Sequence, residues 1–427
     1  MLRLQKVKTW HATSPKSKDV ACYVSKNKKM NTILTIEKRN AVLTTMAKLV
    51  REKAATILTA NETDMTQYDG ADIAMRDRLK VDDSKIDGMI ESLEQLASQE
   101  DPVGVERFRF THDNGMQVFN KTASFGTILI IYESRPDVTI EAGGIAFKSG
   151  NKILLKGGKE SLNSNLAIVK LWHQALSDNG VAMDWVEYMN YNRTETQAFL
   201  EKPTQRVDLI VPRGGERLIA FVKEHATCPV IISGRGNNFV YVHKDADIKT
   251  ALNLIVNGKT DKISACNAVD KVIIDENFAD KDKFTKQLLE KLQEHKVTIL
   301  GDAILAKNAE VTQITNEEIW HEEFLDYKIV LGEIRDTETA IAKINTYSGG
   351  HSAVIVTKDQ SAAEQFMSAV DCAAVYHNAS TRFTDGFQLG LGGELAISTD
   401  KLHQRGPIGL QHLVTNKWYI HGDGQIR

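Results

Sequence analysis

The chain has few of the residues that mark secreted or membrane proteins. Its 427 residues include only 4 cysteines and 7 prolines. No two cysteines have the CxxC spacing of a metal or redox site, and free thiols in a long chain are typical of a reducing compartment. The longest apolar run, about residues 125–132, is far shorter than the ~18 residues of a membrane-spanning helix. The N-terminus lacks the apolar core of a signal peptide, so we expect a soluble, cytoplasmic protein.

The charge balance argues against nucleic acid and anionic membranes as partners. Lys and Arg number 53 and Asp and Glu 56, which gives a net charge of −3. A nearly neutral chain has no general attraction for nucleic acid or anionic membranes, so any anionic ligand must be bound by local cations. Hydrophobic residues make up 42% of the chain and charged residues 26%, an ordinary globular composition. The length predicts about two or three domains.

Hydrophobic periodicity in the first quarter of the chain predicts helices and then a hairpin. Apolar residues recur at helical spacing in 42–57 and again in 86–97. Residues 105–110 and 116–122 alternate instead, and they flank an Asn-Gly turn at 114–115. Asn-Gly between two alternating runs predicts a β-hairpin.

After the hairpin, short apolar strands alternate with helices. Strands at 127–132, 152–156 and 207–211 are each followed by a helical segment. A second such series runs from about 248 to 376, and strand-like sequence returns at 417–420. This order implies right-handed crossovers and parallel sheets. We therefore expect an α/β fold with two parallel-sheet blocks packed together and a cleft between them.

Cys266 is the candidate nucleophile, because small and polar residues surround it. A free thiol has a pKa near 8.5, and lowering it to about 7 takes roughly 2 kcal/mol of anion stabilisation. Lys259, Lys262 and nearby backbone N–H groups are expected to contribute to it. The structural alternative is a small buried hydrophobe, since free cysteine is usually buried. Cys228 and Cys372 lie beside apolar strands and are interpreted as structural.

Two glycine-containing turns, each between a strand and a helix, predict a nucleotide site. Glycines allow close approach of the backbone, and a helix N-terminus with nearby cations favours phosphate. Two such turns at the carboxyl ends of neighbouring strands predict one dinucleotide site, with capped strand–helix junctions as the structural alternative. The residues concerned are Lys156, Gly157, Gly158, Lys159 and the expected N-cap Ser161 in the first turn, and Arg213, Gly214 and Gly215 in the second.

Other polar residues are weighed as candidates for nucleotide, anion or metal binding. Residues 234–236 lack the third glycine of a dinucleotide fingerprint and precede a strand, so we interpret them as a tight turn. Arg135 and Arg382 lie in polar segments that follow strands, and they are candidate anion clamps, with surface ion pairs as the alternative. His351 and His403 have no metal-site spacing, and we expect no metal.

Seven ordered motifs carry a family resemblance. They are YESRPDVTIEAGG from 132, KSGNKILLKGGKES from 148, VDLIVPRGGERLI from 207, CNA from 266, NASTRFTDG from 378 and KLHQRGPIGLQHL from 401, with KWYIHGDGQIR at the C-terminus. On these motifs the chain, from about residue 35 onward, resembles the γ-glutamyl phosphate reductases, also called glutamate-5-semialdehyde dehydrogenases, of the aldehyde dehydrogenase superfamily.

The resemblance implies a nucleotide-binding domain, a catalytic domain and a small β oligomerisation flap. It also implies a homo-oligomer and functional coupling to a glutamate 5-kinase. The expected boundaries are 1–103 and 125–247 for the nucleotide-binding domain, 248–376 for the catalytic domain, 104–124 and 406–427 for the flap, and 377–405 for a returning substrate and cofactor loop region.

The resemblance also implies roles for single residues. Cys266 matches the family nucleophile, and Asn267 with the backbone N–H of Cys266 forms the expected oxyanion hole. Lys156 matches a lysine that reaches the adenosine ribose and 2′-phosphate of NADP(H). The glycines at 214–215 match those beneath the pyrophosphate, and Glu323 resembles the glutamate that holds the nicotinamide ribose.

The implied reaction is the NADPH-dependent reduction of L-glutamyl 5-phosphate to L-glutamate 5-semialdehyde and phosphate, the second step of proline biosynthesis from glutamate, through a Cys266 thioester. Arg135, Arg382 and Lys401 are the cations expected to bind this anionic substrate. Hydrolytic aldehyde dehydrogenases place a water-activating glutamate before the cysteine, and no glutamate occurs from 226 to 275. A hydrolytic NAD-dependent dehydrogenase and a non-catalytic nucleotide-binding scaffold are the alternatives.

Overall fold

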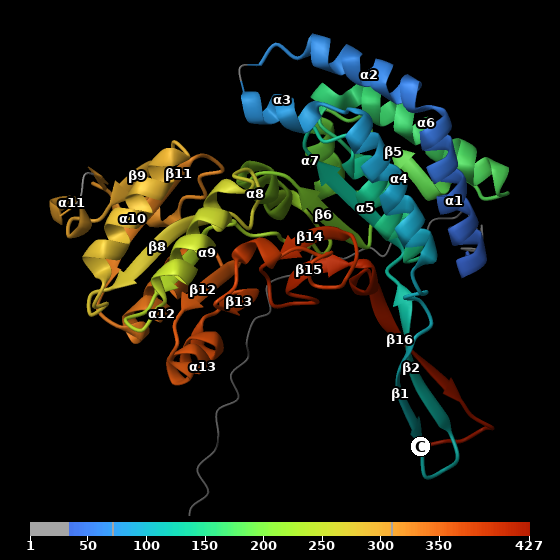
Figure 1. Cartoon of the computed structure of the whole chain (residues 1–427). Helices are drawn as coiled ribbons and strands as arrows, with labels where there is room; N and C mark the ends of the chain where they lie inside the picture. The colour runs from blue at the N-terminus through green and yellow to red at the C-terminus, as the bar shows by residue number, and fades with distance from the viewer. Residues whose placement is uncertain (1–33, 71, 309–310) are drawn as a thin grey trace, which may run out of the picture. The chain divides into compact units, whose positions relative to one another are not determined.

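The structure, a computed structural model, describes residues 34–70, 72–308 and 311–427 (Figure 1). Cys22 therefore lies outside the described residues. The N-terminal region forms the expected helices, with the stripes of apolar residues in 42–57 and 86–97 buried in one core. Thr35 and Asp82 cap two of these helices through their side chains. The helices are α1 (Ile36–Glu52), α2 (Ala54–Gln67), α3 (Ile73–Leu79) and α4 (Asp83–Ser98).

The first sheet is parallel and has the strand order β5-β4-β3-β6. Its two faces are covered by different helices, because alternate residues of a strand point to opposite sides. Ile128 and Ile130 pack with α1, α4, α5 and α6, whereas Leu129 and Ile131 pack with α7 and α8. The elements are β3 (Thr127–Tyr132), α5 (Val138–Lys148), β4 (Lys152–Lys156), η1 (Lys159–Ser161), α6 (Leu162–Asp178), η2 (Met183–Trp185), β5 (Val186–Tyr188), α7 (Arg193–Glu201), β6 (Leu209–Arg213) and α8 (Glu216–His225).

The second sheet is also parallel and has seven strands in the order β10-β9-β11-β8-β7-β12-β13. Helices α9 and α10 cover one face, and α12 and α13 cover the other. The elements are β7 (Asn238–Val242), α9 (Ile248–Thr260), β8 (Val269–Asp275), α10 (Lys281–Glu294), β9 (Thr298–Gly301), α11 (Leu305–Asn308), β10 (Thr312–Gln313), η3 (Glu317–His321), β11 (Lys328–Ile334), α12 (Thr337–Tyr347), β12 (Ser352–Val356), α13 (Gln360–Ala369) and β13 (Ala374–His377).

Two small antiparallel sheets complete the fold. The predicted hairpin is confirmed, and its second strand also pairs with the C-terminal strand, giving the order β1-β2-β16. The other sheet joins β14 to β15, so residues 406–409 pair outside the three-stranded sheet. The elements are β1 (Glu106–Thr111), β2 (Gln117–Ser124), η4 (Thr381–Phe383), β14 (Glu394–Ser398), β15 (Gly406–Gly409), η5 (Leu410–His412) and β16 (Val414–His421).

The structure confirms the α/β fold with two parallel sheets and a small β unit. The larger sheet begins with β7 at residue 238, before position 248, where the catalytic domain was expected to start. The division into functional domains stays a prediction. Across the described ranges, no helix is both long and apolar enough to cross a membrane.

Candidate active site

Cys266 lies in the loop between α9 and β8, and β7 holds this loop in place. Asn238, the first residue of β7, donates from its side-chain amide to the carbonyl oxygens of Cys266 at 2.8 Å and Ala268 at 2.7 Å. Ser352 in turn donates to Oδ1 of Asn238. Gly236 packs so closely on the Cys266 carbonyl that an added Cβ would collide with it. The backbone of Cys266 is therefore held by residues that precede and begin β7.

The surroundings of Cys266 favour its neutral thiol over the thiolate. Burial raises its pKa to about 12, the carboxylates of Glu394 and Glu323 add to the rise, and the guanidinium of Arg213 opposes it. This corrects the expectation of a lowered pKa, because a buried site with two carboxylates disfavours the thiolate.

The lysines expected to stabilise the thiolate do not supply the positive charge at this site. Lys259 is fully buried, and its Nζ lies 2.7 Å from Oδ1 of Asp270. The cations that interact with the Cys266 sulfur are instead the guanidinium groups of Arg213 and Arg135. A guanidinium stays charged when buried, so it suits this position better than an ammonium.

Arg213 ends β6 beside the second glycine turn, and its guanidinium interacts electrostatically with Cys266. Its Nε is buried and has no hydrogen-bond partner among the described residues. Burial and the charge of Arg135 lower its pKa, and Glu394 and Glu141 raise it. An arginine with an unpaired guanidinium nitrogen beside Cys266 is suited to bind an anionic group of a substrate.

Arg135 and Arg382 are both near the site but hold different partners. Arg135 lies 3.1 Å from the carboxylate of Asp137 and also interacts with the Cys266 sulfur. Arg382 contacts Asp261 through Nε at 2.9 Å, and within the described chain its buried Nη1 has no hydrogen-bond partner. Both arginines thus keep hydrogen-bonding capacity for an anion.

Lys401 is not brought to the cysteine by any contact in the structure. It binds Asp371 at 2.8 Å, and its side chain is 70% exposed. Arg405 binds the same carboxylate. Lys401 thus forms a surface ion pair in this structure, and its role in substrate binding stays a prediction.

Asn267 ties the polar loop after β13 to the loop that contains Cys266. Its side-chain amide donates to the carbonyl oxygens of Thr384 at 3.0 Å and Arg382 at 3.3 Å. The hydroxyl of Thr381 donates to the Asn267 carbonyl at 2.6 Å. Since its amide hydrogens already have acceptors, Asn267 has to break a loop contact before it can donate to an oxyanion.

The first predicted phosphate position, the N-terminus of α6, already holds a carboxylate. Asp64, from α2, accepts hydrogen bonds from the backbone N–H groups of Asn163 at 3.0 Å and Ser164 at 2.8 Å. Ser161 takes the N-cap position, but its hydroxyl bonds to the Gly158 carbonyl and caps no N–H group. This corrects the expected role of Ser161, and the buried Asp64 carboxylate occupies the place expected for phosphate.

The second glycine turn also holds a carboxylate, that of Glu133. Its Oε1 accepts the backbone N–H of Gly215 at 2.7 Å, and its side chain lies where a Cβ of residue 214 would be. The two carboxylates differ in exposure, because Asp64 is 2% exposed and the Glu133 side chain 29%. A cofactor pyrophosphate at this turn would have to replace Glu133, which solvent can reach.

Other residues of the expected cofactor site lie at the ends of the same elements. Lys156 ends β4, and its Nζ donates to the carbonyl oxygen of Gly157 at 2.8 Å. Lys159 is exposed. Burial raises the pKa of Glu323 to about 7, and the nearby backbone N–H of Gly236 opposes the rise. These groups fit a dinucleotide whose nicotinamide end approaches Cys266, since Glu323 and Cys266 both contact Gly236.

Glu394 is a site residue that the sequence analysis missed. It begins β14, accepts the backbone N–H of Gly386 at 2.8 Å, and interacts with Cys266 and Arg213. Burial raises its pKa to about 7. Its position after a glycine-rich loop was the only available signal. Asn238 was also missed, although it follows the turn at 234–236 that was interpreted as structural.

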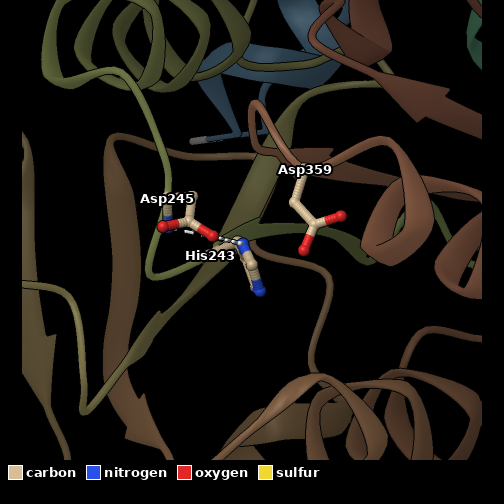
Figure 2. A group of neighbouring side chains, drawn as sticks. All are labelled: His243, Asp245 and Asp359. Atoms are coloured by element: carbon tan, nitrogen blue, oxygen red, sulfur yellow. Dashed lines mark hydrogen bonds and ion pairs between the residues drawn. The ribbon is translucent and has the colours of Figure 1, made fainter.

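A second group of potential metal ligands lies away from Cys266, at the end of β7. Atoms of His243, Asp245 and Asp359 lie within 4.8 Å of one another, and Figure 2 shows His243 in contact with Asp245. However, Nδ1 of His243 is 2.9 Å from the hydroxyl of Thr357, and Asp359 caps α13. These side chains already have structural partners, so we assign them no metal.

Comparison with known proteins shows the family to which the chain is related. The family model of the aldehyde dehydrogenases matches residues 5–319. The γ-glutamyl phosphate reductase of Clostridium botulinum (strain Alaska E43) is 38% identical over 395 residues, covering 92% of this chain and 95% of that protein. That of Agathobacter rectalis is 42% identical over 398 residues, covering 91% and 94%.

Solved structures show the same likeness. The crystal structure of γ-glutamyl phosphate reductase from Thermotoga maritima matches with a TM-score of 0.88 at 37% identity, and the match covers 92% of this chain and 95% of that chain. An engineered glycolyl-CoA reductase with bound NADP⁺ matches with a TM-score of 0.64 at 16% identity, a likeness that concerns the fold alone.

Proposed function

The chain belongs to the aldehyde dehydrogenase family and, within it, to the γ-glutamyl phosphate reductases, and on this basis we propose that it reduces L-glutamyl 5-phosphate to L-glutamate 5-semialdehyde and phosphate with NADPH. The observation that carries the proposal is the placement of Cys266 beside the guanidinium groups of Arg213 and Arg135. A nucleophile flanked by two permanent cations suits an electrophile that carries phosphate and carboxylate groups.

In the proposed reaction, the sulfur of Cys266 attacks the acyl carbon of the substrate. The carbon–sulfur bond forms, the bond from carbon to the phosphate oxygen breaks, and the thiol proton ends on the departing phosphate. Arg213 and Arg135 offset the negative charge that the substrate brings, which also favours ionisation of the thiol. The product of this half-reaction is a Cys266 thioester.

A bound reduced nicotinamide supplies the hydride that the thioester carbon accepts. Glu323 is proposed to hold its ribose, Lys156 the adenosine side, and the turn at 214–215 the pyrophosphate once Glu133 has moved. After reduction the carbon–sulfur bond breaks, the aldehyde leaves, and Cys266 takes up a proton again.

A hydrolytic dehydrogenase is the second candidate, and one observation favours it. No glutamate precedes the cysteine from 226 to 275, but Glu394 lies beside Cys266 and its pKa is about 7. A carboxylate with this pKa is able to activate water against a thioester.

The two candidates differ in their need for phosphate. Oxidation of glutamate 5-semialdehyde by NADP⁺ should require phosphate in the wild type and should be lost in Cys266→Ala. Equal rates with and without phosphate would show a hydrolytic enzyme. We also expect Arg382→Ala to raise the KM for the acyl phosphate strongly while the fold is retained, and an unchanged KM would remove Arg382 from the substrate site.

We also propose a homo-oligomer built through the three-stranded sheet. Phe108 and Trp418 of this sheet form an edge-to-face pair 5.8 Å apart, and both are about half exposed. Exposed aromatic residues on one sheet are typical of a protein interface. A cytoplasmic location and coupling to a glutamate 5-kinase, which would supply the reactive acyl phosphate, complete the proposal.

A further inference from the structure

Glu323 is held through the residues on either side of it. The backbone N–H of Phe324 donates to Oδ2 of Asp270 at 2.8 Å. Nζ of Lys271 donates to the carbonyl oxygen of Glu322 at 2.7 Å. Both contacts come from β8, the strand that follows the nucleophile loop. The peptide groups on both sides of Glu323 are thus tied to that strand.

Asp270 is itself fixed by a second partner. Its Oδ1 lies 2.7 Å from Nζ of Lys259, and the two side chains are 2% and 0% exposed. One carboxylate oxygen therefore pairs with the Lys259 ammonium, and the other accepts the hydrogen bond from the Phe324 N–H. A buried ion pair is weak evidence for stability, because desolvation offsets the attraction. Its fixed geometry is the property that matters here.

Three ammonium groups surround the ring of Phe324. Nζ of Lys271 lies 3.9 Å from the ring centroid, Nζ of Lys328 4.5 Å and Nζ of Lys259 5.9 Å. Cations within about 6 Å of an aromatic centroid attract the ring. The side chain after Glu323 is therefore anchored together with its backbone.

The anchored segment meets the nucleophile through one glycine. The backbone N–H of Gly236 lies near enough to the Glu323 carboxylate to lower its pKa, and Gly236 packs on the carbonyl of Cys266. A shift of the 322–324 segment would therefore move the Glu323 carboxylate relative to the sulfur. We propose that Asp270 and Lys271 are positioning residues that hold Glu323 where it binds the cofactor ribose, so that the strand carrying the nucleophile loop also sets the affinity for NADPH.

This inference rests on the proposed cofactor role of Glu323 and adds a pH dependence to it. Burial lowers the pKa of Lys271 to about 7, with Lys259 and Lys328 lowering it and Asp270 and Glu322 raising it. Above pH 7 the neutral amine donates a weaker hydrogen bond and loses its attraction to the ring. NADPH should therefore bind more weakly as the pH rises through this range.

The test is NADPH binding to the full chain without substrate, followed by the fluorescence of the dinucleotide from pH 6 to 8.5. We expect Lys271→Met to weaken binding about tenfold at pH 6, the loss of one charged hydrogen bond. Lys271→Arg should restore the affinity and remove the weakening toward pH 8.5, because arginine stays charged. Asp270→Asn should also weaken binding.

Lys343→Met is the matched control. Its Nζ lies 3.8 Å from the centroid of Trp320, so it loses a similar cation–ring contact outside residues 322–324. If Lys271→Met bound NADPH like Lys343→Met at every pH, and Lys271→Arg kept the wild-type pH profile, the positioning role would be wrong. If Glu323→Gln itself bound NADPH normally, the failure would lie in the proposed cofactor role of Glu323.

Discussion

The side-chain amide of Asn238 lies 2.8 Å from the carbonyl oxygen of Cys266. Asn238 is fully buried, and its own Oδ1 is occupied by Ser352. One amide group thus connects the start of β7 with the loop that presents the nucleophile. The same amide also donates to the carbonyl oxygen of Ala268 at 2.7 Å, so it contacts the loop at two points.

Replacing Asn238 by alanine should reduce both stability and activity. Buried carbonyl oxygens at Cys266 and Ala268 would lose their donor, which costs about 1–3 kcal/mol of unfolding free energy. The turnover number should fall, whereas the KM should change less, because the Cys266 sulfur is displaced while the arginines that bind the substrate stay in place. Urea unfolding and steady-state kinetics measure the two effects. Asn345→Ala, which removes an exposed backbone contact far from the site, should change neither activity parameter.

Gly236→Ala should inactivate the enzyme through a steric clash. The added methyl would collide with the Cys266 carbonyl, which is backbone and cannot swing aside. The matched control is Gly88→Ala in α4, where an added Cβ meets nothing within 4 Å. This substitution should stabilise the helix by about 0.5–1 kcal/mol. Retention of activity by Gly236→Ala would show that the loop at 266 has room to move.

Glu394→Gln should make Cys266 more reactive. The carboxylate of Glu394 raises the pKa of the thiol, so its removal should lower that pKa. A fall of about one unit would speed alkylation by iodoacetamide about tenfold at a fixed pH below the pKa. Mass spectrometry of the Cys266 peptide over a pH series measures this rate. The exposed Glu290→Gln should leave the rate unchanged, and equal rates in both variants would contradict the prediction.

The unfolding free energy of the protein should fall in mild acid because of His351. Burial lowers the pKa of this histidine to about 4, and Nε2 has no hydrogen-bond partner among the described residues. An unfolded histidine titrates near pH 6.5, so between pH 6.5 and 4 only the unfolded chain binds the proton. The unfolding free energy should therefore be fully retained above pH 6.5 and fall by up to about 1.4 kcal/mol per pH unit below it.

Urea unfolding of His351→Gln between pH 7 and 4.5 checks this account. The unfolding free energy of the variant should depend less steeply on pH than that of the wild type, because the proton that the unfolded His351 takes up no longer contributes. His295→Gln, an exposed histidine after α10, should keep the wild-type slope. Parallel slopes for the wild type and His351→Gln would assign the acid sensitivity to other groups.

Much of the fold follows from local pattern. The apolar runs at 127–132 and 152–156 have the composition of buried strands, and each is followed by a helical period, so the parallel sheets could be predicted. The Asn-Gly turn likewise indicated the hairpin. Cys266 could be selected because few cysteines were available and its neighbours are polar.

The electrostatics of the site could not be read in the same way. Lysines near Cys266 in sequence suggested a lowered pKa, but Lys259 turns to Asp270, and Glu394 reaches the thiol only through the fold. The helix end expected to bind phosphate is closed by Asp64, which lies 99 residues before its partner Asn163. Such pairings depend on tertiary contacts between residues far apart in the chain, so they cannot be predicted from local residue spacing.

The pairing of β2 with β16 joins segments made at different times. All eight residues of β16 align with β2, from Val414 opposite Ser124 to His421 opposite Gln117. On the ribosome, the hairpin emerges long before residues 414–421 exist. Its free edge, with Phe108 and Phe110 nearby, stays available to other nascent chains throughout that interval. We therefore expect the chain to be most prone to pairing with other chains before β16 has been synthesised.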